Sequence, residues 1–302
     1  NPSAPAKLMF LIDKIKRAIF PFYKDSNIRK IFKILNDKNG KEAMFVGGCV
    51  RKYLSNEKID DIDIATVLTP SEVIKKFSNS DFEVKETGIE HGTLTLIKDG
   101  RSFEITTLRE DISTDGRHAK VSFTRDWKKD SERRDFTINA IYLSEKGLVF
   151  DPQNGVSDLK NNKVKFIGDP TQRILEDYLR ILRYIRFTLQ YDCQTDEETI
   201  KTIKINLSGF NNLSKERVYS ELLKILSLEN FQNKILAKTH LKEIFSLIFP
   251  EFKYLYRLKK KKEFFSNKLS AERLLTLLIL DESNNHEYFC YKYKASNKLK
   301  DK

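Results

Sequence analysis

Residues 45–65 read FVGGCVRKYLSNEKIDDIDIA, and this stretch decides the fold. Its pattern predicts an apolar strand, a turn at Gly47-Gly48, a short helix, and a second strand that carries Asp61 and Asp63. Because side chains alternate along a strand, we expect both carboxylates on one face and the intervening isoleucines on the other. Two oxygen donors fixed side by side on a strand favour Mg²⁺ over a softer metal.

The glycine turn before these acids is typical of a phosphate site. Gly47 and Gly48 have no Cβ, so the backbone can approach a ligand closely, and the helix that follows would aim N–H groups at it. Arg51 lies on the first turn of that helix, where a phosphate would sit. A lone DxD pair is a weak sign of metal, since such pairs are common in loops and caps. The combination indicates phosphoryl or nucleotidyl transfer.

Composition favours a polyanionic partner. The 302 residues include 55 Lys and Arg against 43 Asp and Glu, a net charge of +12, and 40% are hydrophobic, which is enough for a core. Cations that neutralise phosphates dominate nucleic-acid affinity. Cys49, Cys193 and Cys290 lie far apart without a CxxC pair, so we expect reduced thiols in a cytoplasmic protein. Since no apolar run is long enough to span a membrane, no membrane partner is expected.

The next segments predict a third acid and a loop. Residues 94–98 and 103–108 are β-rich and are joined around residues 99–100 (Asp-Gly), a strong hairpin signal. Glu104 would join the two aspartates if its strand is their neighbour. Residues 109–125 are polar and lack periodicity, which predicts a mobile loop. From residue 171 onward strand signals vanish, so we expect an all-α second half.

A second polar cluster, residues 132–140 (ERRDFTINA), lies beside an apolar segment. A surface salt-bridge cluster is one interpretation. In the functional interpretation, Arg134 binds a triphosphate while Asp135 and Asn139 position a ribose.

Residues 176–187 (EDYLRILRYIRF) predict one helix. Asp177 and Arg180 would be neighbours on one face, and Glu176 could brace Arg180 or Arg183. An ordinary amphipathic helix explains this spacing equally well. The functional interpretation is a base-pairing edge, in which the carboxylate accepts from an exocyclic amino group and the guanidinium donates to the ring. Such an edge would accept CTP and ATP and reject UTP and GTP.

These residues, in this order, resemble the class II tRNA nucleotidyltransferases (CCA-adding enzymes) and the related bacterial poly(A) polymerases, in the polymerase-β-like nucleotidyltransferase superfamily. The matching motifs are GGxVR at 47–51 with DxD at 61–63, RRDFTxNA at 133–140, DPxxGxxDL at 151–159, EDxxR at 176–180 and ERxxxEL at 216–222. The resemblance covers residues 43–227. Lys52 stands where the family usually has Asp, and the chain continues only a short way beyond the last motif.

The resemblance implies an α+β fold, with an N-terminal nucleotidyltransferase head that has a mixed β-sheet, followed by all-α neck and body domains. The implied division is 1–38 for N-terminal helices, 39–168 for the catalytic head, 169–230 for the neck that selects the nucleotide, and 231–302 for the body with a short basic tail that binds tRNA.

The resemblance also implies an activity, the template-free addition of C, C and A to the tRNA 3′ end from CTP and ATP. Asp61 and Asp63 would hold Mg²⁺, with Glu104 as third catalytic carboxylate. The implied nucleotide-binding residues are Gly48, Arg51, Arg134, Asp135, Asn139, Asp177, Arg180, Arg183 and Arg186. The loop at 109–125 would take part in adding the terminal A.

Two alternatives stay open at this point. The first is a poly(A) polymerase or an enzyme that adds only the terminal A, which use of CTP would distinguish. The second is a non-catalytic RNA-binding protein on the same fold. The intact acid pair argues against this second alternative, since a binding protein has no need of it.

Overall fold

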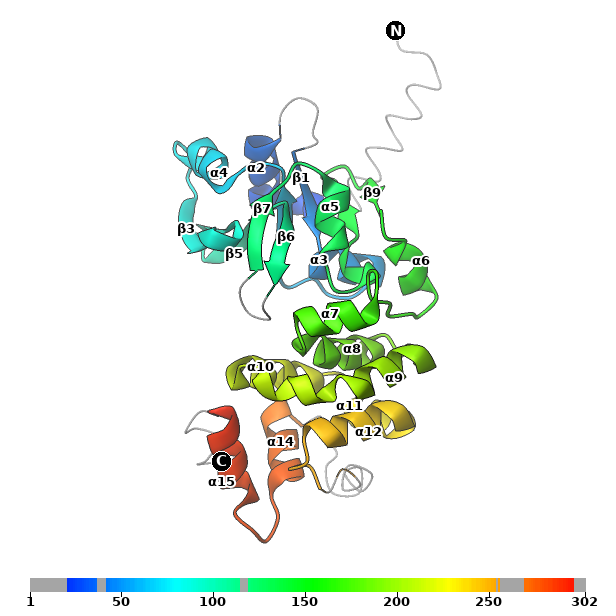
Figure 1. Ribbon diagram of the computed structural model, residues 1–302. Coiled ribbons are helices and arrows are strands. Elements are labelled where there is room, and N and C mark those ends of the chain that lie inside the picture. Colours follow the sequence, from blue (N-terminus) through cyan, green and yellow to red (C-terminus); the bar gives the residue numbers. More distant parts are fainter. Residues whose placement is uncertain (1–20, 37–41, 115–118, 254, 256–268, 296–302) are drawn as a thin grey trace. The chain divides into compact units, whose positions relative to one another are not determined.

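The described part of the chain forms two compact units. The computed structural model describes residues 21–36, 42–114, 119–253, 255 and 269–295 (Figure 1). Described residues up to 160 form unit 1, and those from 161 onward form unit 2. The predicted helices before residue 21 and the basic run 259–262 lie outside the described residues, and the predicted four-part division stays a prediction.

Unit 1 contains a mixed sheet and short helices. Its elements are η1 (Pro21–Lys24), α2 (Ser26–Leu35), β1 (Ala43–Val46), α3 (Gly48–Leu54), β2 (Asp63–Thr66), α4 (Pro70–Phe77), β3 (Glu83–Gly88), η2 (Ile89–His91), β4 (Thr93–Lys98), β5 (Arg101–Thr107), β6 (Arg109–Thr114), β7 (Ala119–Phe123), α5 (Trp127–Glu132), η3 (Thr137–Asn139), β8 (Tyr142–Leu143), β9 (Val149–Phe150) and α6 (Gly155–Lys160).

The seven-stranded sheet has the order β3-β4-β5-β2-β1-β8-β9. β2 and β5 run parallel with Asp63 opposite Glu104, while every other neighbouring pair is antiparallel. The mixed sheet is therefore confirmed, and the strand that carries Glu104 is the neighbour of the strand that begins at Asp63.

The two faces of this sheet carry different side chains. On one face, Ile64, Phe103 and Ile105 belong to a large buried cluster that also contains Phe32 of α2 and Phe77 of α4. Because side chains alternate, Asp63 and Glu104 point to the other face, where the apolar cluster is small. The sheet thus buries one face in the core and leaves the other available for polar chemistry.

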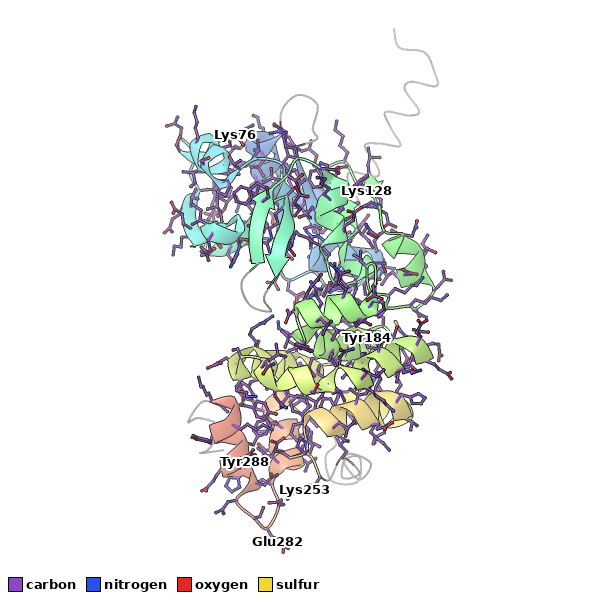
Figure 2. The ribbon with its side chains drawn as sticks, viewed as in Figure 1. Lys76, Lys128, Tyr184, Lys253, Glu282 and Tyr288 are labelled. Atoms are coloured by element: carbon purple, nitrogen blue, oxygen red, sulfur yellow. The ribbon has the colours of Figure 1, made fainter. Side chains whose placement is uncertain are left out.

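Local signals in the sequence explain several element boundaries. Thr69 and Glu72 form a complete capping box at the start of α4. Asp99 and Gly100 have positive φ angles of 53° and 71°, as the tight hairpin between β4 and β5 requires. Near the end of α4, Lys76, which is labelled in Figure 2, donates to the carbonyl of Leu35 at 2.9 Å.

The prediction of a loop over residues 109–125 is wrong. Within the described residues, β6 and β7 form an antiparallel two-stranded ribbon. A register shift between Asp111 and Ser113 interrupts the pairing, so the two-residue alternation that marks a strand is broken within the segment. Residues 115–118, which include His118, lie outside the described part.

Unit 2 is all-α in its described residues, as predicted. Its helices are α7 (Pro170–Glu176), α8 (Leu179–Gln190), α9 (Glu197–Ile205), η4 (Leu207–Asn212), α10 (Lys215–Leu226), α11 (Phe231–Ala237), α12 (Thr239–Ile248), α14 (Ala271–Ile279) and α15 (Asn285–Tyr293). α10 packs against α8, α14 and α15. In the described segments, no helix has the length and apolar character needed to cross a membrane.

Candidate active site

Two acids lie side by side on the polar face of the unit 1 sheet, and a third, Asp61, precedes the first of them by two residues. Asp63 begins β2 and lies opposite Glu104 of β5. The prediction that Asp61 lies on the same strand is wrong, because β2 begins only at Asp63. The Ile62 carbonyl nevertheless accepts the N–H of Glu104 at 3.2 Å, so the backbone pairing continues toward Asp61.

These neighbours change the acidity of Asp63. Burial, together with the charges of Glu104 and Asp61, raises the pKa of Asp63 to about 6, against a smaller lowering by Arg134 and Arg51. The charged form of Asp63 is thus disfavoured unless a cation joins the acids. A divalent cation stabilises an ionised carboxylate that lies near other acids on a surface with few apolar side chains.

The donor set fits an ion that shares its ligands with a substrate. Among the described residues, no three His, Cys, Asp or Glu side chains are grouped closely enough to hold a metal by themselves. Mg²⁺ commonly uses one or two carboxylates and completes its shell with water and substrate phosphates. Asp61 and Asp63 supply that number of carboxylates.

The glycine turn approaches these acids closely. Gly47 has a φ of 71°, and a Cβ added to it would lie 3.6 Å from Oδ2 of Asp63. A Cβ on Gly48 would lie 4.0 Å from the same oxygen and from Nη2 of Arg51. Any side chain at these positions would therefore occupy space between the acids and Arg51 that a nucleotide needs.

Arg51 is held by the second polar cluster. Its guanidinium donates to Oδ1 of Asn139, and Nδ2 of Asn139 donates to Oδ1 of Asp135 at 2.8 Å. All three residues are buried. In this arrangement Asp135 and Asn139 orient Arg51, and their predicted contact with a ribose stays a prediction.

Arg134 is oriented by an acid that sequence reasoning missed. Asp130 is fully buried and accepts from Arg134 at 3.0 Å, from Arg133 at 2.8 Å and from the Tyr142 hydroxyl at 2.7 Å. Although burial alone would raise its pKa, the two guanidinium groups hold it well below the usual range. The acid stands three and four residues before the two arginines, which is the helical spacing that could have revealed it.

Lys52, the departure from the family pattern, forms an ion pair of its own. Its Nζ lies 2.7 Å from Oδ2 of Asp60, the residue before Asp61. The pair links α3 to the segment that leads into β2. Because the Asp60 side chain is 58% exposed, the contribution to stability is small, on the order of 0.2–1 kcal/mol.

The DPxxGxxDL motif supports the second polar cluster. Asp151 accepts the N–H groups of Gly155 and Val156 at 2.8 and 2.9 Å and so caps α6. Asp158 on that helix accepts from the Thr137 hydroxyl at 2.7 Å. The motif therefore fixes η3, which carries Asn139.

Gly155 lets α6 lie directly on η3, and we expect Gly155→Ala to loosen this contact. The added Cβ would lie 2.1 Å from the Thr137 carbonyl oxygen. The backbone must shift, so the free energy of unfolding should fall by about 1–3 kcal/mol in urea titrations. Gly88→Ala is the control, since its Cβ would make an ordinary contact at 3.6 Å. Equal stability of the two variants would contradict the packing argument.

In unit 2 the predicted single helix over residues 176–187 is broken at Asp177. α7 ends at Glu176, Asp177 is extended, and α8 begins at Leu179. Oδ1 of Asp177 accepts the N–H of Leu179 at 3.1 Å, so the carboxylate caps the start of α8 as Asp residues often do. Its Oδ2 accepts from Arg217 of the ERxxxEL motif at 2.7 Å.

The predicted brace on Arg180 is confirmed. Glu176 accepts from Arg180 at 2.6 Å and from Arg173 at 2.8 Å. Arg180 also donates to the Arg173 carbonyl at 2.8 Å. These contacts hold the guanidinium in one orientation.

Arg183 and Arg186 follow Arg180 at helical spacing. Both lie over the ring of Phe187, with guanidinium carbons 5.6 and 4.1 Å from its centroid. Arg186 also donates to the buried Glu221 of α10 at 2.5 Å. Tyr184, on the same helix, is buried and stacks on Phe166 at 5.8 Å (Figure 2).

Two family models match this chain. Residues 43–165 match the poly A polymerase head domain, and residues 194–255 match a domain described as a probable RNA and SrmB-binding site of polymerase A.

Curated relatives match nearly two thirds of this chain. The human mitochondrial CCA tRNA nucleotidyltransferase 1 is 47% identical over 193 residues, which are 63% of this chain and 44% of that protein. The CCA-adding enzyme of Limosilactobacillus reuteri is 41% identical over 64% of this chain and 48% of its own. The chain thus spans about half the length of these relatives.

Among solved structures, the Bacillus stearothermophilus CCA-adding enzyme in complex with CTP superposes with a TM-score of 0.76. It is 28% identical, and the match covers 94% of this chain and 68% of that one. The head, neck and body architecture predicted from the motifs is therefore confirmed at the level of fold.

Proposed function

Because this chain belongs to the class II nucleotidyltransferases, with a poly A polymerase head domain at residues 43–165, we propose that it adds C, C and A to the 3′ end of tRNA without a template. The observation that carries the proposal is the approach of the Gly47-Gly48 turn to Asp63, whose pKa is raised by burial and by the charges of Glu104 and Asp61. A glycine turn against a destabilised carboxylate suits a metal-bound triphosphate.

The residues of the head would have separate roles in the reaction. Asp61 and Asp63 would hold Mg²⁺, which when bound favours ionisation of the primer 3′-hydroxyl and neutralises the departing pyrophosphate. Glu104 places a further carboxylate beside Asp63. Arg51 and Arg134, each oriented by buried partners, would bind the triphosphate oxygens.

Asp177 and Arg180 would select the base. The Asp177 carboxylate is fixed by Arg217 and by the N–H of Leu179, and Arg180 is fixed by Glu176. A fixed acceptor beside a fixed donor matches the amino group and ring nitrogen of cytosine or adenine. Uracil and guanine place a carbonyl where the carboxylate needs a donor, so we expect UTP and GTP to be rejected. Arg183 and Arg186 would add positive charge near the bound nucleotide.

A reducing compartment suits this protein, since Cys49, Cys193 and Cys290 are free and buried. We therefore keep the cytoplasm as its proposed location. The vertebrate relatives are mitochondrial by name, which makes the mitochondrion the alternative.

Primer extension tests the proposal. The protein is given Mg²⁺ and a tRNA transcript that lacks its 3′ CCA, with CTP alone, ATP alone, both together, or UTP. Two added C from CTP, and one further A when ATP is present, are expected. Long A tails with CTP ignored would identify a poly(A) polymerase instead. Absence of extension in every condition, with RNA binding retained, would support the non-catalytic alternative.

A further inference from the structure

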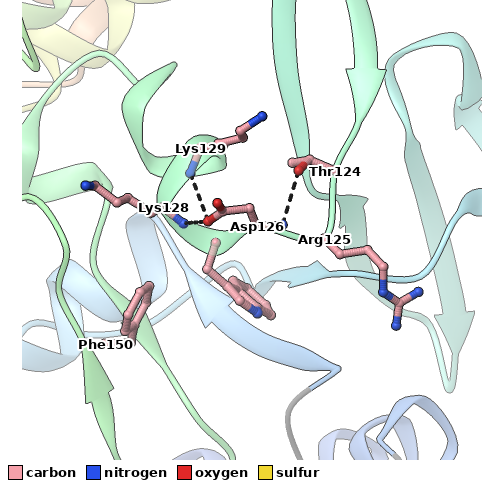
Figure 3. A pocket seen from close by; sticks show the side chains of 7 residues that line it. Thr124, Arg125, Asp126, Lys128, Lys129 and Phe150 are labelled. Atoms are coloured by element: carbon pink, nitrogen blue, oxygen red, sulfur yellow. Dashed lines mark hydrogen bonds between the residues drawn. The ribbon is translucent and has the colours of Figure 1, made fainter.

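A second site on unit 1 lies apart from the acids. A cavity of about 660 Å³ opens where β7 leads into α5, with the exposed Phe150 of β9 on one side (Figure 3). Its lining residues are Thr124, Arg125, Asp126, Trp127, Lys128, Lys129 and Phe150. The hollow is shallow and open to solvent, which suits a surface that an extended chain crosses better than an enclosed ligand site.

The two rings of this pocket are held rigidly. Trp127 packs edge-on against Tyr142 with centroids 5.3 Å apart, and Phe150 packs on the same ring at 6.0 Å. Tyr142 is fully buried, and its hydroxyl donates to Asp130 at 2.7 Å. Rigid aromatic surfaces that remain reachable from solvent are the platforms on which unpaired bases stack.

The polar side chains around these rings are cationic. Arg125, Lys128 and Lys129 are exposed, and within the described residues neither Arg125 nor Lys128 forms an ion pair. Asp126, the acid among them, accepts the N–H groups of Lys128 and Lys129 at 2.8 and 3.4 Å (Figure 3). Among the described side chains, Lys129 pairs with Glu110 at 3.2 Å, and Arg125 lies near enough to the exposed Glu72 of α4 to lower the pKa of that carboxyl. The lining therefore offers aromatic faces beside three cations and one acid, a net positive charge.

We propose that this pocket binds single-stranded RNA, with one unpaired base against Trp127 and Phe150 and the flanking phosphates on Arg125 and Lys128. Aromatic stacking combined with cations that follow the backbone is the general mode of sequence-tolerant single-strand binding. Tyr142 joins this pocket to the Arg134 cluster, since Arg134 lies over the Tyr142 ring at 5.4 Å. The RNA would thus be held close to the residues that bind the triphosphate. The inference rests on the proposed RNA substrate.

The chain carries its own probe for this test, because Trp127 is its single tryptophan. The full chain is titrated with a single-stranded RNA oligonucleotide, with an RNA duplex of matched length, and with CTP or ATP alone. Single-stranded RNA is expected to quench the tryptophan emission. Phe150→Ser should weaken this binding about 10-fold through loss of stacking. Lys128→Glu should weaken it and lower the slope of log affinity against log salt by about one.

Matched variants separate local from general effects. Leu148→Ser changes an exposed apolar residue that does not line the pocket, and Lys85→Glu makes the same charge change at an exposed position of β3, the edge of the sheet opposite β9. Both should bind RNA as the native protein does.

Three results would overturn the proposal. The first is RNA binding, measured by the fluorescence polarisation of a labelled oligonucleotide, that leaves the tryptophan emission unchanged. The second is equal quenching by CTP or ATP alone. The third is tryptophan emission that shifts with protein concentration, as a second copy bound at the pocket would cause. Quenching without primer extension would keep the pocket and refute the CCA-adding activity. Primer extension without quenching would support the CCA-adding activity and refute RNA binding at the pocket.

Discussion

Asp63→Asn is expected to abolish nucleotide addition while making the metal-free protein more stable. Loss of a carboxylate that we propose as a metal ligand should lower kcat by on the order of 10³-fold or more, because a metal supplies several kcal/mol of charge stabilisation in the transition state. The gain in stability has a separate cause, since ionisation of Asp63 at neutral pH raises the free energy of the folded state.

The sign of this effect follows from linkage. The pKa of Asp63 is about 6 in the folded protein against an ordinary 3.8, so the folded state holds the proton more tightly than the unfolded state. Stability is therefore lost as the pH rises from about 4 to about 6, and the loss above that range is up to about 3 kcal/mol. Asparagine removes the titration, so the advantage of the variant should be absent near pH 4 and complete above pH 6.

Urea unfolding in EDTA at pH 4 and at pH 8 measures this difference. Added Mg²⁺ should stabilise the native protein at pH 8 and leave Asp63→Asn unchanged. Glu86→Gln, an acid-to-amide change at an exposed position of β3, is the control and should affect neither stability nor activity. A variant that is less stable than the native protein at pH 8 would contradict the argument.

The sequence predicted best where a short motif determines local geometry. The glycine turn, the strand neighbour of Asp63 and the Glu176–Arg180 pair all follow from spacing within a few residues, or from one strand pairing. Such features depend on backbone geometry that the residue types themselves impose.

The errors concern features that tertiary contacts decide. The break at Asp177 depends on the carboxylate capping α8 while Arg217, forty positions along the chain, binds its other oxygen. Among the β6 and β7 residues whose burial the structure describes (109–111 and 121–123), none is buried, so no buried face imposes alternation there, and the register shift breaks the pattern further. The roles of Asp130 and Tyr142 appear only when α5 and β8 are placed together. Periodicity carries no information about such pairings.

Asp130→Ala should be the most destabilising single change in unit 1. The carboxylate is fully buried. It forms ion pairs with Arg133 and Arg134 and accepts a hydrogen bond from the Tyr142 hydroxyl. Its removal would leave two mostly buried guanidinium groups without their shared anion, and breaking a buried pair on one side costs about 3–5 kcal/mol. Arg134 would also lose its orientation, so KM for CTP and ATP should rise more than kcat falls.

The pH dependence distinguishes this loss from a simple cavity. Arg134 and Arg133 hold the pKa of Asp130 below its ordinary value, so its contribution is present above that ordinary value and is lost as the pH falls toward the folded-state pKa. The difference between native protein and variant should therefore shrink in acid, whereas a cavity penalty would not change with pH. Asp130→Asn keeps an acceptor for the Tyr142 hydroxyl without the charge and should retain part of the stability. If both variants unfold at the urea concentration of the native protein and keep its KM, Asp130 does not orient Arg134.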